Sequence, residues 1–372
     1  MKKLIISTVG TSILTNIESA NRKLLNNNSN CKEIECAKDL IEHVNELKIA
    51  ASSKLESLKN VNELKRLSAE LNSLYCIFDK YQNDKEDIHF LISTDTYQGK
   101  ICGEILKNHL EFNGINAQIE TPSSFNTRTK DSFDEGIKNL ITWCENIIPA
   151  YKNAGYQIIF NLTGSFKSMI GYMNTIAMFY ADKITYIFES TQADLIEIPK
   201  LPIELNTSNF SSFADKLALA SLGYNFQLGE ISELPELLFD NIENKAFFSV
   251  WGELIWSKVK KELLSYKLVN FPKVKYSETL KKLFKDASKE DKINFQETIA
   301  KISKLLLEND GNLSCLKADG GLQYEDIKNK YDNGKPIGHI RISQSERISC
   351  TYENGQILIR KFGRHDFINN DP

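Results

Sequence analysis

The sequence lacks the features that define several large classes of protein. It has no apolar run long enough to cross a membrane, about 18 residues or more, so we expect no membrane-spanning helix. The chain goes directly into a strand pattern, and we expect no secretory signal. The seven cysteines are an odd number, are scattered, and form no Cys-x-x-Cys pair. We therefore expect a cytoplasmic protein with reduced thiols, without disulfides and without a metal site.

Two glycine-rich nucleotide motifs are also missing. The P-loop pattern Gly-x-x-x-x-Gly-Lys-[Ser/Thr] fails, because only two residues separate Gly164 from Lys167 and no upstream glycine is in register. The dinucleotide pattern Gly-x-Gly-x-x-Gly does not follow the first predicted strand. These absences argue against ATP or NAD bound in the standard ways, and we expect no cofactor.

The remaining composition is that of an ordinary globular protein. The chain has 372 residues, 41% of them hydrophobic and 26% charged, which allows two or three domains with separate cores. Its net charge of -3 conceals a basic C-terminal third and a more acidic remainder. A basic C-terminal third permits a nucleic-acid partner but does not require one.

In the first 200 residues, short apolar strands alternate with helical patterns. This alternation predicts an α/β, Rossmann-like domain with a parallel, doubly wound sheet. Before the second strand, the pattern predicts a loop over 15–30 and one or two long helices over 31–81. We expect strands near 3–8, 89–94, 117–120, 157–162 and 184–188, and helices over 97–112, 133–151 and 166–181.

Small hydroxyl residues follow several of these strands. Gly10, Thr11 and Ser12 follow the first strand, Thr94 ends the second, and residues 161–168 (Asn-Leu-Thr-Gly-Ser-Phe-Lys-Ser) form a turn before a helix. Ligands of doubly wound sheets bind beyond the carboxyl ends of the strands, and helix N-termini suit phosphate. The alternative is that these hydroxyls only cap the following helices.

The rest of the chain changes character after Pro199 and Pro202. Residues 201–264 predict a helical connector, with helices over 213–222 and 234–261. The aromatic residues Phe247, Trp251 and Trp256 in the second helix suggest core or a dimer interface. Residues 265–372 predict an α+β domain of βααβββ order, with two lysine-rich helices over 277–308 before three strands.

Basic side chains crowd these last strands. A sheet face lined by Arg and His could bind RNA phosphates and stabilise a phosphorane, while a histidine transfers protons near neutral pH. The fitting reaction is metal-free RNA cleavage, in which the 2′-OH attacks the adjacent phosphate; the alternative is a solvated face. The candidate catalytic residues are His339, Arg341, Arg347, Arg360, Arg364 and His365.

Arg360 and His365 also match the Arg-x-x-x-x-His signature of the helical HEPN ribonucleases. That signature requires a helix. The residues between them include a glycine and follow a β-branched run, which predicts a strand and a turn. We therefore discount a HEPN site.

Residues 1–200 resemble a CARF domain, the CRISPR-associated Rossmann-like sensor, on segments 7–12, 91–96 and 161–168. The resemblance implies a homodimer that binds cyclic oligoadenylate across its axis. By resemblance to the ring-cleaving members, Ser12 would orient the nucleophile and Lys167 would stabilise the transition-state phosphate. The implied ligand-binding residues are Gly10, Thr11, Ser12, Thr94, Asn161, Thr163, Gly164, Ser165, Phe166 and Lys167.

Residues 265–372 resemble a RelE-type toxin, on segments 338–341, 346–349 and 362–366. That family cleaves mRNA on the ribosome without metal. The resemblance matches Arg341 and Arg347 to the basic residues of the central strands, and Arg364 and His365 to the acid/base region. A tyrosine often found after that region is not obvious here; Phe367 stands nearby and cannot transfer a proton, which favours His365.

Together the two resemblances imply a type III CRISPR ancillary effector, a CARF–RelE mRNA interferase activated by cyclic tetra-adenylate, with the ribosome and mRNA as partners and no membrane. Two other functions stay open. One is a ligand-sensing transcription regulator whose basic C-terminal third binds DNA. The other is a standalone ring nuclease with an inert C-terminal domain.

Overall fold

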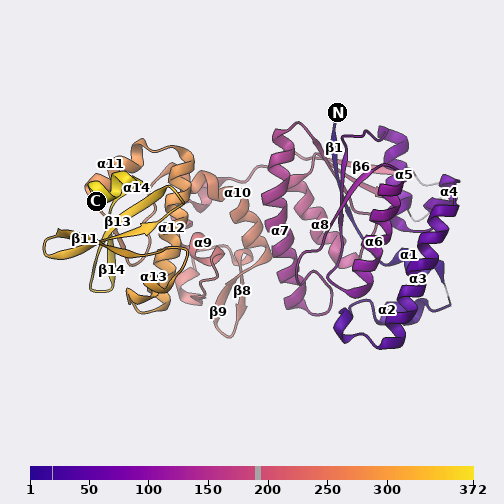
Figure 1. Cartoon of the computed structure of the whole chain (residues 1–372), viewed down its shortest axis with the longest axis horizontal. Helices are drawn as coiled ribbons and strands as arrows, with labels where there is room; N and C mark the ends of the chain where they lie inside the picture. Colours follow the sequence, from indigo (N-terminus) through magenta and orange to yellow (C-terminus); the bar gives the residue numbers. More distant parts are fainter. Residues whose placement is uncertain (19, 189–193) are drawn as a thin grey trace. The chain divides into compact units, whose positions relative to one another are not determined.

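The computed structural model describes residues 1–18, 20–188 and 194–372. The described chain forms two compact units, Met1–Ile203 and Glu204–Pro372, which Figure 1 colours from indigo to magenta and from pink to yellow. Within the described segments, no helix has both the length and the apolar character needed to cross a bilayer.

The first unit is built on one six-stranded sheet with helices on both faces. Its elements are β1 (Lys3–Thr8), α1 (Ser12–Ile17), α2 (Arg22–Asn27), α3 (Lys38–Ser57), α4 (Val61–Lys65), α5 (Ala69–Tyr81), β2 (Ile88–Ile92), α6 (Tyr97–Phe112), β3 (Asn116–Glu120), α7 (Lys130–Asn153), β4 (Gln157–Asn161), α8 (Lys167–Tyr180), β5 (Lys183–Ile187) and β6 (Leu195–Pro199).

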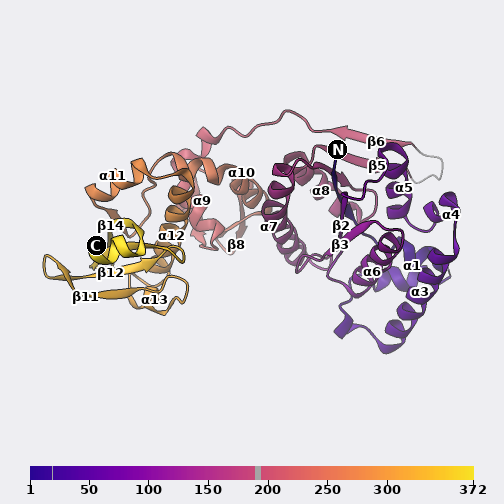
Figure 2. The ribbon, with the colours of Figure 1, turned by 45° about the horizontal axis from the view of Figure 1, so that its top comes forward.

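The strand order is β3-β2-β1-β4-β5-β6, and all neighbours are parallel except β5 and β6. Helices α7 and α8 lie on one side of β1, and α5 and α6 lie on the other, in Figure 1, and Figure 2 shows the same two pairs on either side of β2 and β3. Every residue of β1 is buried, as expected for a central parallel strand covered on both faces. The predicted Rossmann-like α/β architecture is therefore confirmed at the level of a parallel sheet with helices.

Three sequence predictions for this unit were wrong. Residues 15–30 are not a loop, because α1 and α2 lie there, each only six residues long. Residues 31–81 form three α-helices rather than one or two, separated by breaks around Leu58 and Ser68. Strand β6 was not predicted; it is antiparallel to β5 and none of its residues is fully buried, so its apolar signal is weak.

The second unit contains two small sheets and a group of helices. Its elements are α9 (Ala214–Ser221), β7 (Phe226–Gln227), β8 (Phe239–Ile242), β9 (Lys245–Phe248), α10 (Val250–Tyr266), β10 (Val274–Tyr276), α11 (Glu278–Asp286), α12 (Lys289–Glu308), α13 (Ser314–Ala318), β11 (Glu325–Asp332), β12 (Lys335–Arg341), β13 (Glu346–Glu353), β14 (Gln356–Arg364) and α14 (His365–Asn370), together with short 3-10 turns.

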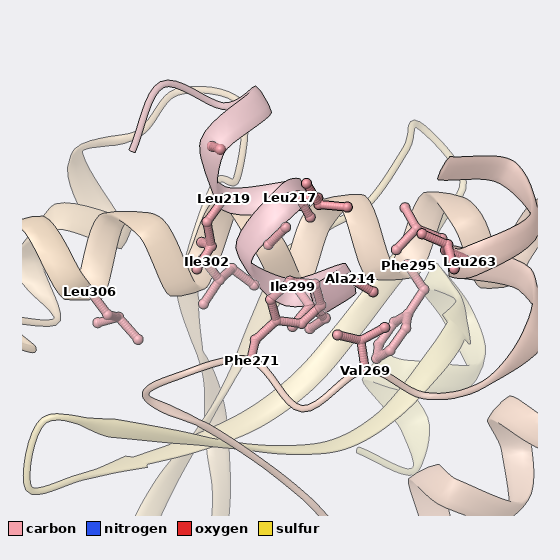
Figure 3. Packing of buried hydrophobic residues seen from close by; sticks show 14 of the residues in the cluster. Ala214, Leu217, Leu219, Leu263, Val269, Phe271, Phe295, Ile299, Ile302 and Leu306 are labelled. Carbon is pink, nitrogen blue, oxygen red and sulfur yellow. The ribbon is translucent and has the colours of Figure 1, made fainter. Parts of the chain in front are cut away.

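The larger sheet has the order β10-β14-β13-β12-β11, with β10 parallel to β14 and the other neighbours antiparallel. One face packs on α11 and α12, where Phe295 and Phe362 have ring centroids 4.6 Å apart. Figure 3 shows apolar side chains from α9, from α12 and from the segment of Val269 and Phe271 gathered in one cluster. The residues expected as a connector therefore share one hydrophobic core with the C-terminal strands.

Two predictions for this unit need correction. The helix expected over 234–261 is instead the hairpin β8–β9 followed by α10, because Glu243 and Asn244 both adopt positive φ at a tight turn. The expected βααβββ order also omits β11, whose charged sequence suits an exposed edge strand and gives little apolar signal. The two predicted helices over 277–308 are confirmed as α11 and α12, with Ser288 capping the second.

Candidate functional site

The strand order places a topological switch point between β1 and β4. The chain moves outward from β1 to β3 and then returns to the other side of β1 as β4. In doubly wound sheets, ligands bind beyond the carboxyl ends of the strands at such a switch point. The turn after β1 carries Gly10, Thr11 and Ser12, and the turn after β4 carries Thr163 to Lys167.

One side-chain hydrogen bond joins the end of β1 to the turn after β4. The Thr8 hydroxyl donates to the Gly164 carbonyl. A Cβ atom on Gly10 would lie 3.4 Å from the Ser165 amide nitrogen, so the backbones of the two turns approach closely. The two predicted ligand-binding turns therefore form one surface.

Within this surface, the predicted residues differ in exposure. Partial exposure is shared by Gly10, Thr11, Ser12, Thr163, Ser165 and Phe166. Lys167 is exposed at the first position of α8, and makes no ion pair with any described residue. Its ammonium group and the N-terminal amides of a 14-residue helix form the more electropositive side of the site.

Three predicted residues lie beneath the surface instead. Gly164 is buried, and Asn161 is 1% exposed and spends its amide hydrogens on Ser7 and Ser73. Thr94 is 2% exposed, and its hydroxyl bonds the Thr96 hydroxyl at 2.9 Å. Asn161 therefore supports the turns from below, and Thr94 packs at the start of α6.

Sequence reasoning missed the most unusual residue of the site, Glu70 in the first turn of α5. Its side chain is 1% exposed and reaches both turns. Glu70 Oε1 accepts a hydrogen bond from the Gly10 amide at 2.7 Å, and Oε2 accepts one from the Ser12 hydroxyl at 2.9 Å. A Cβ atom on Gly164 would lie 2.0 Å from Oε1, so only glycine fits there.

The sequence offered little signal for this contact. An acidic residue in a first helical turn usually interacts with the helix dipole, and Glu70 lies nearly 60 residues from Gly10 and Ser12. The Glu70 carboxylate also acts on Cys102 of α6: burial, and then the charge of Glu70, raises the pKa of the Cys102 thiol well above its usual value. The long helical segment after β1 thus contributes a carboxylate to the site.

In the second unit, Arg341 and Arg347 are direct cross-strand partners on β12 and β13. Both guanidinium groups bond the Ser343 carbonyl, at 3.2 Å for Arg341 Nε and 2.7 Å for Arg347 Nη1. Burial, and then the charge of Arg341, lowers the pKa of Arg347. Two like charges held in one place are typical of an anion-binding site.

His339 lies on the same strand face as Arg341, as its spacing predicted, and contacts the C-terminal helix. His339 Nδ1 lies 3.1 Å from Asn369 Oδ1, and Asn369 Nδ2 lies 3.1 Å from His365 Nε2. The two imidazole centroids are 6.4 Å apart. One amide side chain therefore holds the two candidate proton-transfer groups together.

The structure does not bring the other two candidate arginines into this cluster. Arg360 is the extra residue of a β-bulge in β14, where it pairs with Asp332. Arg364 pairs in register with Glu346, next to Arg347 and Gly363, and so lies on the opposite face of the sheet from Arg347. It lines a pocket with Asp286, Glu290, Asp291 and Glu346. The strand conformation of Arg360 is consistent with rejecting a helical HEPN motif.

The C-terminal segment lies on the face that carries His339 and Arg347. Ile368 of α14 is fully buried against this sheet. Lys361 Nζ lies 2.7 Å from Asp371 Oδ2, and Lys330 Nζ donates to the Asn370 carbonyl at 2.9 Å. Part of the predicted basic face is therefore covered by the chain's own last residues, and the Arg341–Arg347 pair lies beside the covered part.

One comparison with known families bears on the first unit. Residues 65–201 match the family described as CRISPR-associated protein (Cas_APE2256). This match supports a CRISPR-associated protein. The matched segment includes Glu70 and the whole turn from Asn161 to Lys167, but it leaves out the turn after β1 and the second unit.

Proposed function

We propose that the first unit binds cyclic oligoadenylate, with cyclic tetra-adenylate as the activator, across a homodimer. The observation that carries this proposal is the joined pair of turns at the switch point of a Rossmann-like sheet, part of which matches a CRISPR-associated family. The exposed ammonium of Lys167 and the N-terminus of α8 suit a ligand phosphate. A ring with several phosphates and two-fold symmetry can meet this surface twice in a dimer.

The second unit is, in this proposal, a metal-independent endoribonuclease that cuts ribosome-bound mRNA. Its support is the Arg341–Arg347 pair beside the two histidines. The guanidinium groups would neutralise the phosphate that the 2′-OH attacks. His365 or His339 would transfer the proton, since an imidazole can act as a general acid or a general base. Arg360 and Arg364 take no catalytic part, because each is engaged elsewhere or on the other face.

Ligand control requires that the ligand bind one of two conformations of the protein more tightly than the other. The first unit would also degrade its own activator slowly, with Ser12 orienting the attacking 2′-OH and Lys167 stabilising the phosphate. Ring cleavage then limits how long the ribonuclease stays active.

The test is mRNA cleavage on translating ribosomes, with and without cyclic tetra-adenylate. We expect cuts only with the ligand, and their loss in Arg347→Ala and in His365→Ala. Lys282→Ala is the matched control, because Lys282 is exposed on α11, a helix that packs on the other face of the sheet. A transcription regulator would instead bind duplex DNA and leave mRNA intact, and a standalone ring nuclease would consume the ligand without cutting mRNA. Either result overturns the ribonuclease proposal.

A further inference from the structure

The buried Glu70 carboxylate changes what the turn after β1 can bind. A turn with a free amide and a free hydroxyl would offer two donors to a ligand phosphate. Here both donors are already used, because the Gly10 amide and the Ser12 hydroxyl both donate to Glu70. The fixed negative charge also repels a second anion at the same point.

The hydrogen bonds that Ser12 already makes show which part of its hydroxyl remains open to a ligand. A serine hydroxyl has one hydrogen to donate and two lone pairs that accept. The hydrogen goes to Glu70 Oε2 at 2.9 Å, and one lone pair accepts the Ala69 amide hydrogen at 3.1 Å. Ser12 is partly exposed, so its second lone pair can reach a ligand. That lone pair requires a donor, and a phosphodiester offers none at neutral pH.

We propose that Glu70 is a positioning residue that makes Ser12 a hydrogen-bond acceptor, so that the turn after β1 recognises a ribose 2′-hydroxyl while the turn after β4 takes the phosphate. This inference rests on the proposed binding of a cyclic oligoadenylate and adds a specificity to it. The site selects a ribonucleotide ring over the same ring built from 2′-deoxynucleotides. The phosphate lies toward Lys167 and the N-terminus of α8, away from the Glu70 charge.

Glu70 is held in place strongly enough to act in this way. It is 1% exposed, it is fixed by two hydrogen bonds from different residues, and it lies against Gly164 at a distance that admits no side chain there. Its two oxygens each accept a hydrogen bond from a different donor, the Gly10 amide and the Ser12 hydroxyl.

The test replaces Glu70 by the isosteric Gln. In Glu70→Gln, the amide oxygen can still accept the Gly10 hydrogen bond, while the amide nitrogen donates to Ser12. The Ser12 hydrogen is then free to point at the ligand. The affinities of cyclic tetra-adenylate and of its all-2′-deoxy analogue are measured by calorimetry for both proteins.

We expect the wild-type protein to prefer the ribonucleotide ring by about tenfold or more, the range of a lost hydrogen bond at a polar site. In Glu70→Gln we expect this ratio to fall toward one, with tighter binding of the deoxy ring because a negative charge is gone. Glu63→Gln, at an exposed position on α4, is the control and should keep the wild-type ratio.

Several outcomes overturn the inference. If Glu70 only supports the fold, Glu70→Gln weakens both ligands equally and the ratio stays at its wild-type value. A wild-type protein that binds both rings equally also removes the inference but leaves the proposed ligand intact. A wild-type protein that binds neither ring defeats the proposed function itself. If Glu70→Gln does not fold, Ser12→Ala replaces it: an unchanged ratio in that variant has the same meaning as in Glu70→Gln.

Discussion

Asn161 and Ser7 are register partners on neighbouring strands, and the Asn161 side-chain amide donates to the Ser7 hydroxyl at 3.1 Å. The same amide donates to Ser73 on α5 at 2.8 Å. One buried side chain therefore connects β4, β1 and the helix that carries Glu70. The relative placement of the two turns and the carboxylate depends on this connection.

We expect Asn161→Ala to lower the free energy of unfolding by about 1–3 kcal/mol, because it leaves two buried hydroxyls without their donor. The protein that remains folded should also bind the ligand more weakly than the wild type, because the two turns lose their common support. Urea denaturation and calorimetry measure the two effects. Asn108→Ala, on the exposed side of α6, should change stability by about 0.5 kcal/mol or less. Equal stability of the two variants would contradict the supporting role of Asn161.

Much of the first unit could be predicted from the sequence. The parallel strands are short apolar runs, and polar residues mark their carboxyl ends, so the edge carrying Ser12 and Lys167 was predictable. The contribution of Glu70 was not predictable in this way. Its role depends on how α5 packs against β1 and β4, and no local pattern encodes that packing.

The second unit shows a different limit. Alternation along β12 and β13 correctly placed His339 and Arg341 on one face. The pairing of β13 with β14 then shifts at a bulge, where Arg360 is one extra residue on β14. The side chains that follow Arg360 therefore face the opposite way from a regular hairpin, and Arg364 lies on the opposite face from Arg347. The ion pair that engages Arg360 comes from β11, an edge strand too polar to predict.

The contact between Gly164 and Glu70 predicts that substitutions at these two residues have non-additive effects on stability. In Gly164→Ala, the new Cβ would lie 2.0 Å from Glu70 Oε1 and 2.5 Å from its Cδ, so the carboxylate must move. We expect loss of ligand binding and a destabilisation of about 1–3 kcal/mol, the usual cost of overpacking. The double variant with Glu70→Ala should regain part of that stability, which a double-mutant cycle measures.

Gly171→Ala is the matched control, because nothing lies within 4 Å of a Cβ at that position of α8. It should stabilise the protein by about 0.5–1 kcal/mol. Strictly additive effects of Gly164→Ala and Glu70→Ala would show that the two side chains do not share the space.

His89 on β2 predicts a loss of stability in mild acid. The residue is fully buried, and burial lowers the pKa of its imidazole to about 4. The unfolded chain, with a pKa of about 6.5, therefore binds more protons than the folded chain between these values. The stabilisation that His89 contributes is present above about pH 6.5 and is lost as the pH falls toward 4. Between pH 7 and pH 5 the loss is about 2 kcal/mol. Urea denaturation of the wild type and of His89→Gln at both values measures it, and parallel pH profiles would refute it.

We expect substitution of Arg360 to affect mainly stability and substitution of Arg347 to affect mainly mRNA cleavage. Arg360→Ala leaves Asp332 without its partner on a partly buried surface, so we expect a destabilisation of about 1–3 kcal/mol. The fraction that remains folded should still cut mRNA at the wild-type rate. Arg347→Ala should keep its stability and lose cleavage by about 100-fold or more, the range of a lost electrostatic contact to a reacting phosphate. Cleavage rates normalised to folded protein distinguish the two, and a stable but inactive Arg360→Ala would return Arg360 to the active site.

Ser12 and Lys167 flank the place where the ring would be cleaved, and their variants separate binding from chemistry. Ser12→Ala removes the group that would orient the attacking 2′-OH, and Lys167→Ala removes the charge that would stabilise the phosphate. We expect both to slow ring cleavage by about 100-fold or more while measurable binding persists, so ligand-dependent mRNA cleavage should last longer than in the wild type. Lys85→Ala, an exposed position before β2, is the control for charge and should cleave the ring normally. Chromatography of the ligand after incubation measures the products. Unchanged turnover in both site variants would mean that the first unit senses the ring and leaves its removal to another enzyme.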